Sequence, residues 1–117
     1  MATYAGVDLG ATNVRVVVGD ETGTVISTRK TPTPQGPSGI AVIEAILDAL
    51  RDVCDDAGVH PKQLEAVGIG SFGPLHLAEG AVVNPANLPD EVERIPLTGP
   101  IKNLIGSDEV YLHNDTT

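Results

Sequence analysis

Two short apolar runs joined by a tight polar link constrain the fold of this chain more than any other feature. The runs Tyr4–Val7 and Val14–Asp20 are typical of β-strands, and the second is rich in β-branched residues. The link Gly10–Asn13 is so short that the two strands must lie side by side and run in opposite directions. The chain is therefore predicted to begin with a β-hairpin whose first strand ends at Asp8.

The residues of this link are chemically suited to bind phosphate. Gly10 lets the backbone bend and approach a ligand closely, and the following amides, of Ala11, Thr12 and Asn13, can then point at phosphate oxygens. A carboxylate beside phosphates would repel them unless a hard cation lay between, so Asp8 implies Mg²⁺ held through water. Taken alone, the segment also fits an ordinary β-hairpin with a surface aspartate.

The next segments predict a third strand and then a loop. A turn cluster at Asp20–Gly23 precedes the strand-like run Thr24–Thr31. Three strands joined by tight links form an antiparallel meander. The proline-rich stretch Pro32–Pro37 that follows can be neither a helix nor a central strand, so we expect a loop.

A long amphipathic helix is predicted after this loop. Apolar residues recur at helical spacing from Ile40 to Ala57, and acidic residues occupy the opposite side. Ser38 is suited to cap the start of the helix, and Gly58 to end it. Cys54 falls on the apolar stripe and is expected in the core; as the only cysteine, it excludes a disulfide within the chain.

The second half of the chain alternates short strands with irregular segments. We expect a buried strand at Leu64–Ile69, a strand of a small hairpin at Ala81–Val83 and an irregular proline-rich loop at Asn84–Pro96. A short helix at Pro100–Ile105 and a last strand at Glu109–His113 are expected to follow. Gly106 is predicted to end the short helix. Because Asn114 and Asp115 follow the last strand so near the end, we expect the chain to be a fragment cut before its next helix.

Length and charge exclude several classes of protein. A chain of 117 residues corresponds to one domain. Its 16 acidic and seven basic residues give a net charge of −9, which repels nucleic-acid backbones. No apolar stretch is long enough for a membrane span, and no secretory signal precedes the first strand. We therefore expect a cytoplasmic protein that binds neither nucleic acid nor membranes.

Four motifs together resemble a known family. Asp8–Asn13 resembles the first phosphate motif of the actin and hexokinase superfamily. Gly68–Leu75, Asn84–Pro89 and His113–Asp115 resemble the ROK (repressor, open reading frame, kinase) branch of sugar kinases. The motifs occur in the family's order and cover nearly the whole chain. The resemblance implies an α/β fold, the ribonuclease H-like or actin-like ATPase half-domain, whose mixed sheet combines a three-stranded antiparallel meander with further strands and flanking helices.

The resemblance also implies roles for individual residues. Asp115 matches the catalytic aspartate, which orients a sugar hydroxyl and accepts its proton late in phosphoryl transfer. Asn87 and Asn114 match residues that hydrogen-bond the sugar, since amide side chains both donate and accept. Ser71 and Gly73 fall in the glycine-rich loop that lets the backbone approach the sugar.

The implied activity is ATP-dependent phosphorylation of a hexose, as in a glucokinase, in a cleft between two lobes. Residues 1–117 would form the N-terminal lobe, with Asp8 and Gly10–Asn13 binding ATP and water-bound Mg²⁺. We expect the isolated lobe to be inactive, and a homodimer is a possible assembly of the full-length protein. Ala11 stands where relatives commonly carry a second glycine, which requires a negative φ at this residue.

Other functions stay open on the sequence. The ROK family includes transcriptional regulators that sense sugars, but their added DNA-binding segment is not expected here, because Met1 lies only a few residues before the first strand. A metal-dependent nuclease of the ribonuclease H-like fold would use Asp8 and Asp115 together on metal ions, and a non-enzymatic actin-like protein is a further alternative. Neither the sugar nor the donor, ATP or polyphosphate, follows from the sequence.

Overall fold

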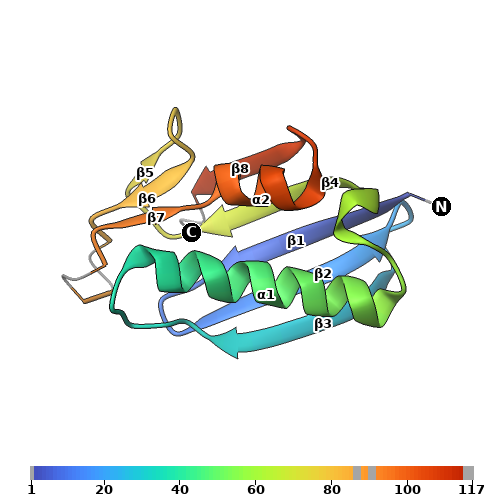
Figure 1. The fold of residues 1–117 in the computed structure, drawn as a ribbon, viewed down its shortest axis with the longest axis horizontal. Coiled ribbons are helices and arrows are strands. Elements are labelled where there is room, and N and C mark those ends of the chain that lie inside the picture. The colour runs from blue at the N-terminus through green and yellow to red at the C-terminus, as the bar shows by residue number, and fades with distance from the viewer. Residues whose placement is uncertain (1, 86–87, 90–91, 115–117) are drawn as a thin grey trace.

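A mixed five-stranded sheet forms the centre of the structure, a computed structural model that describes residues 2–85, 88–89 and 92–114. The order across the sheet is β3-β2-β1-β4-β8 (Figure 1). The strands span Thr3–Leu9 (β1), Asn13–Asp20 (β2), Val25–Pro32 (β3), Leu64–Ser71 (β4) and Val110–Asn114 (β8). The first three form the predicted antiparallel meander, whereas β1, β4 and β8 are parallel.

Both α-helices lie on one face of this sheet. Helix α1 (Gly39–Ala57) leads through a short 3₁₀ turn, η1 (Pro61–Gln63), into β4, and α2 (Thr98–Ile105) leads into β8. The two connections step across the sheet in the same direction, so crossovers of one hand bring both helices to the same side. Figure 1 shows α1 and α2 in front of the sheet. The other face carries no helix from the described residues.

Helix α1 confirms the strongest prediction from the sequence. The Ser38 hydroxyl accepts a hydrogen bond from the Ile40 amide (3.3 Å) at the start of the helix. Gly58 ends it in the left-handed conformation (φ 73°), where its amide donates to the carbonyl of Asp55. Cys54 is fully buried on the apolar side, as expected, and burial raises the pKa of its thiol.

The core lies between this helical layer and the sheet. Alternate residues of the strands point toward the helices, which follows from the period of two in a β-strand. The buried apolar members of β1, β2 and β4 are Ala5, Val7, Leu9, Val14, Val16, Val18, Leu64, Val67 and Ile69. The residues between them therefore point to the uncovered face.

A second, three-stranded antiparallel sheet corrects one prediction. It consists of β5 (Leu75–His76), β6 (Ala81–Val83) and β7 (Arg94–Pro96) in that order. The hairpin predicted at Ala81–Val83 is confirmed, but Asn84–Pro96 is not irregular throughout, because its last three residues pair with β6. Proline is compatible with β7 since this is an edge strand, which can lack one amide donor.

The start of α1 packs directly on this small sheet. A Cβ atom at Gly39 would lie only 1.6 Å from the carbonyl oxygen of Arg94 on β7. Glycine is therefore required here by the close approach of two backbones. This contact joins the first turn of the helix to β7 and fixes the small sheet against the main domain.

Two polar features orient the β2–β3 hairpin. At its turn, the Asp20 carboxylate accepts hydrogen bonds from the amides of Thr22 (2.9 Å) and Thr24 (3.2 Å). These bonds and one from the Thr22 hydroxyl lower the pKa of Asp20. Farther along β3, Arg29 points to the helical side and pairs with Asp56 of α1 (3.0 Å).

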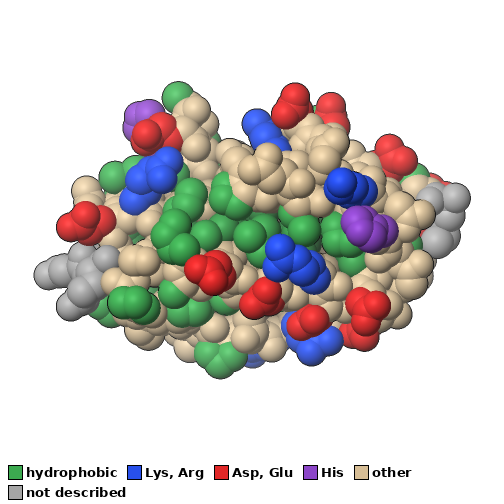
Figure 2. All heavy atoms as spheres, viewed as in Figure 1, with side chains coloured by type: hydrophobic (Ala, Val, Ile, Leu, Met, Phe, Trp, Pro, Cys, Tyr) green, Lys and Arg blue, Asp and Glu red, His purple; other side chains and the backbone are tan. Residues whose placement is uncertain are grey.

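The surface over the helices combines charged side chains with an apolar strip. Figure 2 shows acidic groups along α1 and hydrophobic side chains gathered between α1 and α2. Leu47, Pro100 and Leu104 line the hollow between these helices, and Arg51 and Lys62 border it. Among the described residues, no helix has the length and apolar character needed to cross a bilayer.

Candidate active site

The carboxyl ends of β1, β4 and β8 lie at one edge of the central sheet (Figure 1). At this edge Leu9 lies opposite Ser71, and Ser71 lies opposite Asn114. Neighbouring strands are roughly 4.8 Å apart, so the backbones of β1 and β8 are about 10 Å apart here. The predicted phosphate loop (Gly10–Asn13) and the strand leading to Asp115 thus share one edge, although Asp115 itself lies outside the described residues.

Hydrogen bonds from the segment after β3 hold the phosphate loop in place. The Thr33 hydroxyl donates to the Gly10 carbonyl (2.7 Å), and the Thr33 amide donates to the Thr12 carbonyl (2.9 Å). The Gln35 side chain donates to the Ala11 carbonyl (3.1 Å). Three successive carbonyl groups of the loop are therefore occupied by protein donors.

In contrast to these carbonyl groups, two amides of the loop have no protein partner among the described residues. Those of Ala11 and Thr12 donate to no acceptor among the described residues, so they are available to an anionic ligand. Gly10 donates to the Asn13 carbonyl (3.0 Å), and a Cβ atom at Gly10 would lie 3.1 Å from that same oxygen. The φ angle of Ala11 is negative, as expected from the sequence. Among the described non-glycine residues, only Asn84 has a positive φ.

A cavity of about 360 Å³ opens beside this loop. It is lined by Asp8, Gly10, Ala11, Thr12, Asn13, Arg15 and Lys30. The cavity thus joins peptide amides, one carboxylate and two cationic side chains. Such a set can bind an anion directly and a hard cation through the carboxylate.

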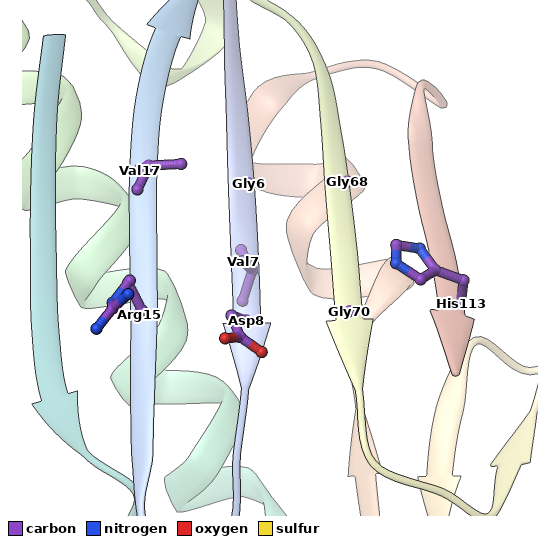
Figure 3. A pocket seen from close by; sticks show the side chains of 8 residues that line it. All are labelled: Gly6, Val7, Asp8, Arg15, Val17, Gly68, Gly70 and His113. Carbon is purple, nitrogen blue, oxygen red and sulfur yellow. The ribbon is translucent and has the colours of Figure 1, made fainter. Parts of the chain in front are cut away.

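A second hollow, of about 370 Å³, lies on the uncovered face of the sheet (Figure 3). Three glycines within β1 and β4 carry no side chains on this face, and the hollow lies over them: Gly6, Gly68 and Gly70. Figure 3 shows the side chain of Asp8 between that of Arg15 on β2 and that of His113 on β8. The Asp8 carboxylate therefore borders both the cavity beside the phosphate loop and the hollow that extends to β8.

The predicted sugar-binding residues occupy different environments. Ser71 is fully buried at the end of β4, and its hydroxyl donates to the Phe72 carbonyl (2.9 Å). Gly73 is half-buried in the turn that follows, and Asn114 is the last residue of β8. Asn87 lies outside the described residues. The sugar-binding roles of these four residues stay predictions.

Comparison with known proteins identifies the family. The family model described as "ROK family" matches residues 4–117. The chain belongs to the ROK family. It is 40% identical over 102 residues to a glucokinase from Pyrobaculum calidifontis, covering 87% of this chain and 29% of that protein.

Solved ROK structures share the fold. The ROK hexokinase from Thermus thermophilus superposes with a TM-score of 0.77 at 32% identity, over 97% of this chain and 35% of the hexokinase. A ROK glucokinase from Streptomyces griseus, solved in complex with glucose and AMPPNP, gives 0.75 at 29% identity, over 97% of this chain and 33% of its own. The ROK domain described here thus spans about a third of the length of these relatives. The predicted actin-like α/β fold is confirmed.

The ROK domain also fits the magnesium ion implied by the resemblance. No three His, Cys, Asp or Glu side chains cluster into a metal cage within the described residues. Mg²⁺ needs no such cage, because it retains waters and is held by one or two carboxylates together with substrate phosphates. The exposed carboxylate of Asp8 beside the phosphate loop matches this kind of site.

Several residues of this site were not found from the sequence. Thr33 and Gln35 lie in a proline-rich segment, where nothing in the pattern indicates what their side chains contact. Lys30 lies on a strand that is polar on both faces, so its direction could not be assigned. The alternation of β8 could have placed His113 on the uncovered face, given that Leu112 points toward the core.

Proposed function

We propose that the full-length protein is an ATP-dependent hexose kinase and that this ROK domain is its N-terminal lobe. The observation that carries the proposal is the phosphate loop, whose carbonyls are held by Thr33 and Gln35 while the amides of Ala11 and Thr12 have no protein acceptor. Such a loop, next to an exposed carboxylate and two cations, matches the needs of a nucleoside triphosphate.

On the donor side, each group has a distinct task. The free amides of the loop bind the terminal phosphate oxygens, and Asp8 holds hydrated Mg²⁺ near them. A magnesium ion held there by Asp8 would supply positive charge that offsets the negative charge developing on the phosphate oxygens during transfer. The rigid hold on the loop carbonyls keeps the amides oriented before the donor arrives, which lowers the cost of reorganisation.

On the acceptor side, the proposed base is Asp115, the next residue in sequence after β8, whose carboxyl end lies at this same edge of the sheet. Its carboxylate orients a sugar hydroxyl toward the donor and accepts the proton late, when the transferring group is largely detached. Asn87, Asn114 and the loop carrying Ser71 and Gly73 hold the remaining hydroxyls.

Glucose is the first substrate to test. The Pyrobaculum relative is a glucokinase, and the Streptomyces relative was solved with glucose and AMPPNP. The chain spans about a third of these proteins, so the assay requires the full-length polypeptide. Initial rates of ADP formation with MgATP should depend on added glucose, while the isolated 117-residue lobe should give no detectable turnover.

The decisive variant is Asp115→Asn in the full-length protein. We expect kcat to fall by a factor of about 10² or more, the usual contribution of a positioned base, with little change in the KM for ATP. Asp108→Asn is the matched control, because this exposed carboxylate precedes β8 and lies away from the edge that binds substrates. Near-normal turnover of Asp115→Asn would exclude its role as base.

The other functions considered from the sequence give different results in the same preparation. A sugar-sensing regulator would bind hexose without forming ADP. A ribonuclease H-like nuclease would cleave nucleic acid with Mn²⁺ and would not require a sugar. Either pattern, in the absence of glucose-dependent ADP formation, would contradict the proposal.

A further inference from the structure

Lys30 is brought to the phosphate loop by the pairing of β2 with β3. It lies directly opposite Arg15, which in turn lies opposite Asp8 on β1. Residues that face each other across antiparallel strands point to the same side of the sheet. Asp8, Arg15 and Lys30 therefore form one row across three strands on the uncovered face, and all three line the cavity beside the loop.

The neighbouring residue of β3 shows how specific this placement is. Arg29 points to the opposite face, where Asp52 and Asp56 of α1 lie 4.0 and 3.0 Å from its guanidinium nitrogens. Arg29 thus has a structural role in attaching the helix to the sheet edge. Lys30, one position later, has no such partner among the described residues.

The two cations of this row, Arg15 and Lys30, form no ion pair within the described part of the chain. Among the described residues, three of the seven basic side chains form ion pairs, namely Arg29, Arg51 and Arg94, so Arg15 and Lys30 differ from other unpaired cations by facing each other beside the phosphate loop. Two exposed positive charges directly opposite each other repel and are unfavourable in a sheet. An anion bound between them would remove the repulsion and would offset the acidic field of the protein.

We propose that Lys30 is a donor-binding residue, which together with Arg15 contacts the phosphate chain of the nucleoside triphosphate. This inference rests on the proposed kinase function and adds a residue to its donor site. The phosphate chain would extend from the loop amides across β2 to β3. The flexible ammonium of lysine can follow phosphate oxygens as a mobile point charge, whereas the guanidinium of Arg15 offers a fixed set of donors.

The test compares Lys30→Gln, Lys30→Arg and Arg29→Gln in the full-length protein. The two glutamine variants remove the same charge from adjacent positions of one strand, but on opposite faces of the sheet. We expect Lys30→Gln to raise the KM for MgATP about 1.5-fold to fivefold, the range for one exposed charge contact, without changing the KM for glucose. Lys30→Arg should restore most of the affinity, and Arg29→Gln should leave the KM for MgATP unchanged.

Salt dependence provides a second readout that a merely structural role would not change. Added KCl weakens contacts between exposed charges, so the KM of the wild-type protein for MgATP should rise with salt, and that of Lys30→Gln should rise less. Equal KM values for Lys30→Gln and Arg29→Gln, with equal salt dependence, would overturn the inference. Failure of the kinase proposal itself is distinguishable, because the wild-type protein would then form no ADP in response to glucose.

Discussion

At the scale of single residues, Thr33 has the most consequential position outside the phosphate loop. It is almost fully buried, and both its amide and its hydroxyl donate to loop carbonyls, those of Thr12 and Gly10. A polar group that loses its partner in such a place retains the full cost of its removal from water. The hydroxyl of one side chain therefore supports both the stability of the loop and the direction of its amides.

Replacement of Thr33 by valine should show the contribution of the hydroxyl hydrogen bond, because the two side chains have nearly the same volume. Thr33→Val keeps the shape but leaves the Gly10 carbonyl without its donor, so the free energy of unfolding should fall by about 1–2 kcal/mol in urea denaturation. In the full-length protein the KM for MgATP should rise. Thr33→Ser keeps the hydroxyl and serves as the control; an equal loss in both variants would show that the methyl group, not the hydrogen bond, is responsible.

At the scale of elements, the junction between α1 and β7 depends on one missing side chain. Gly39→Ala would place a methyl group 1.6 Å from the Arg94 carbonyl oxygen, where neither backbone can move freely. We expect a loss of at least about 3 kcal/mol in the free energy of unfolding, the upper range for overpacking. The measurement is urea denaturation of the 117-residue chain.

Gly99→Ala in α2 is the control for this prediction. A Cβ atom there would meet nothing within 4 Å, so alanine should leave stability unchanged or raise it by about 0.4–1 kcal/mol. If Gly39→Ala were tolerated as well as Gly99→Ala, the close packing of α1 on β7 would be wrong.

The elements differ in how far the sequence determined them. Helix α1 was predictable because its apolar spacing, the cap at Ser38 and the stop at Gly58 all indicate the same boundaries. Strand β7 was missed because the prolines of Asn84–Pro96 indicate a loop, and only pairing with β6 makes an edge strand of its last residues. That pairing is a tertiary contact, which local patterns do not contain.

The candidate site was predictable to a similar degree. Asp8 and the phosphate loop follow from local chemistry, and the resemblance to the ROK family supplied Asp115. Lys30 could not be predicted, because β3 is exposed on both faces and lacks the hydrophobic alternation that would orient it. Its direction is set by Arg15 across the β2–β3 pairing, not by its own neighbours in sequence.

At the scale of the whole molecule, the acidic surplus should make stability depend on salt. A net charge of −9 produces self-repulsion in the compact state, which added ions screen. The melting midpoint should therefore rise between about 0.05 and 2 M KCl, by roughly 4 °C for each kcal/mol of repulsion relieved in a chain of this size.

A doubly neutralised variant tests whether the effect comes from charge. Glu44 and Asp55 lie exposed on α1 and form no ion pair among the described residues. The combined Glu44→Gln and Asp55→Asn variant should melt higher at low salt and respond less to KCl. A melting midpoint that does not change with salt in either protein would contradict the predicted destabilisation by charge repulsion.

The hydrogen-bonded turn at Asp20 has a consequence for how this hairpin can evolve. Arg29 and Lys30 are consecutive cations on opposite faces of the sheet. Arg29 pairs with Asp56 of α1, whereas Lys30 lines the candidate donor cavity. A one-residue shift in the pairing of this part of β3 with β2 would exchange the faces of the two cations, whereas a shift of two residues would preserve them. Natural length variation in this hairpin should therefore be confined to the turn and to the irregular pairing between Val18 and Gly19, where β3 already accommodates one extra residue, and should leave the register at Arg29 and Lys30 unchanged.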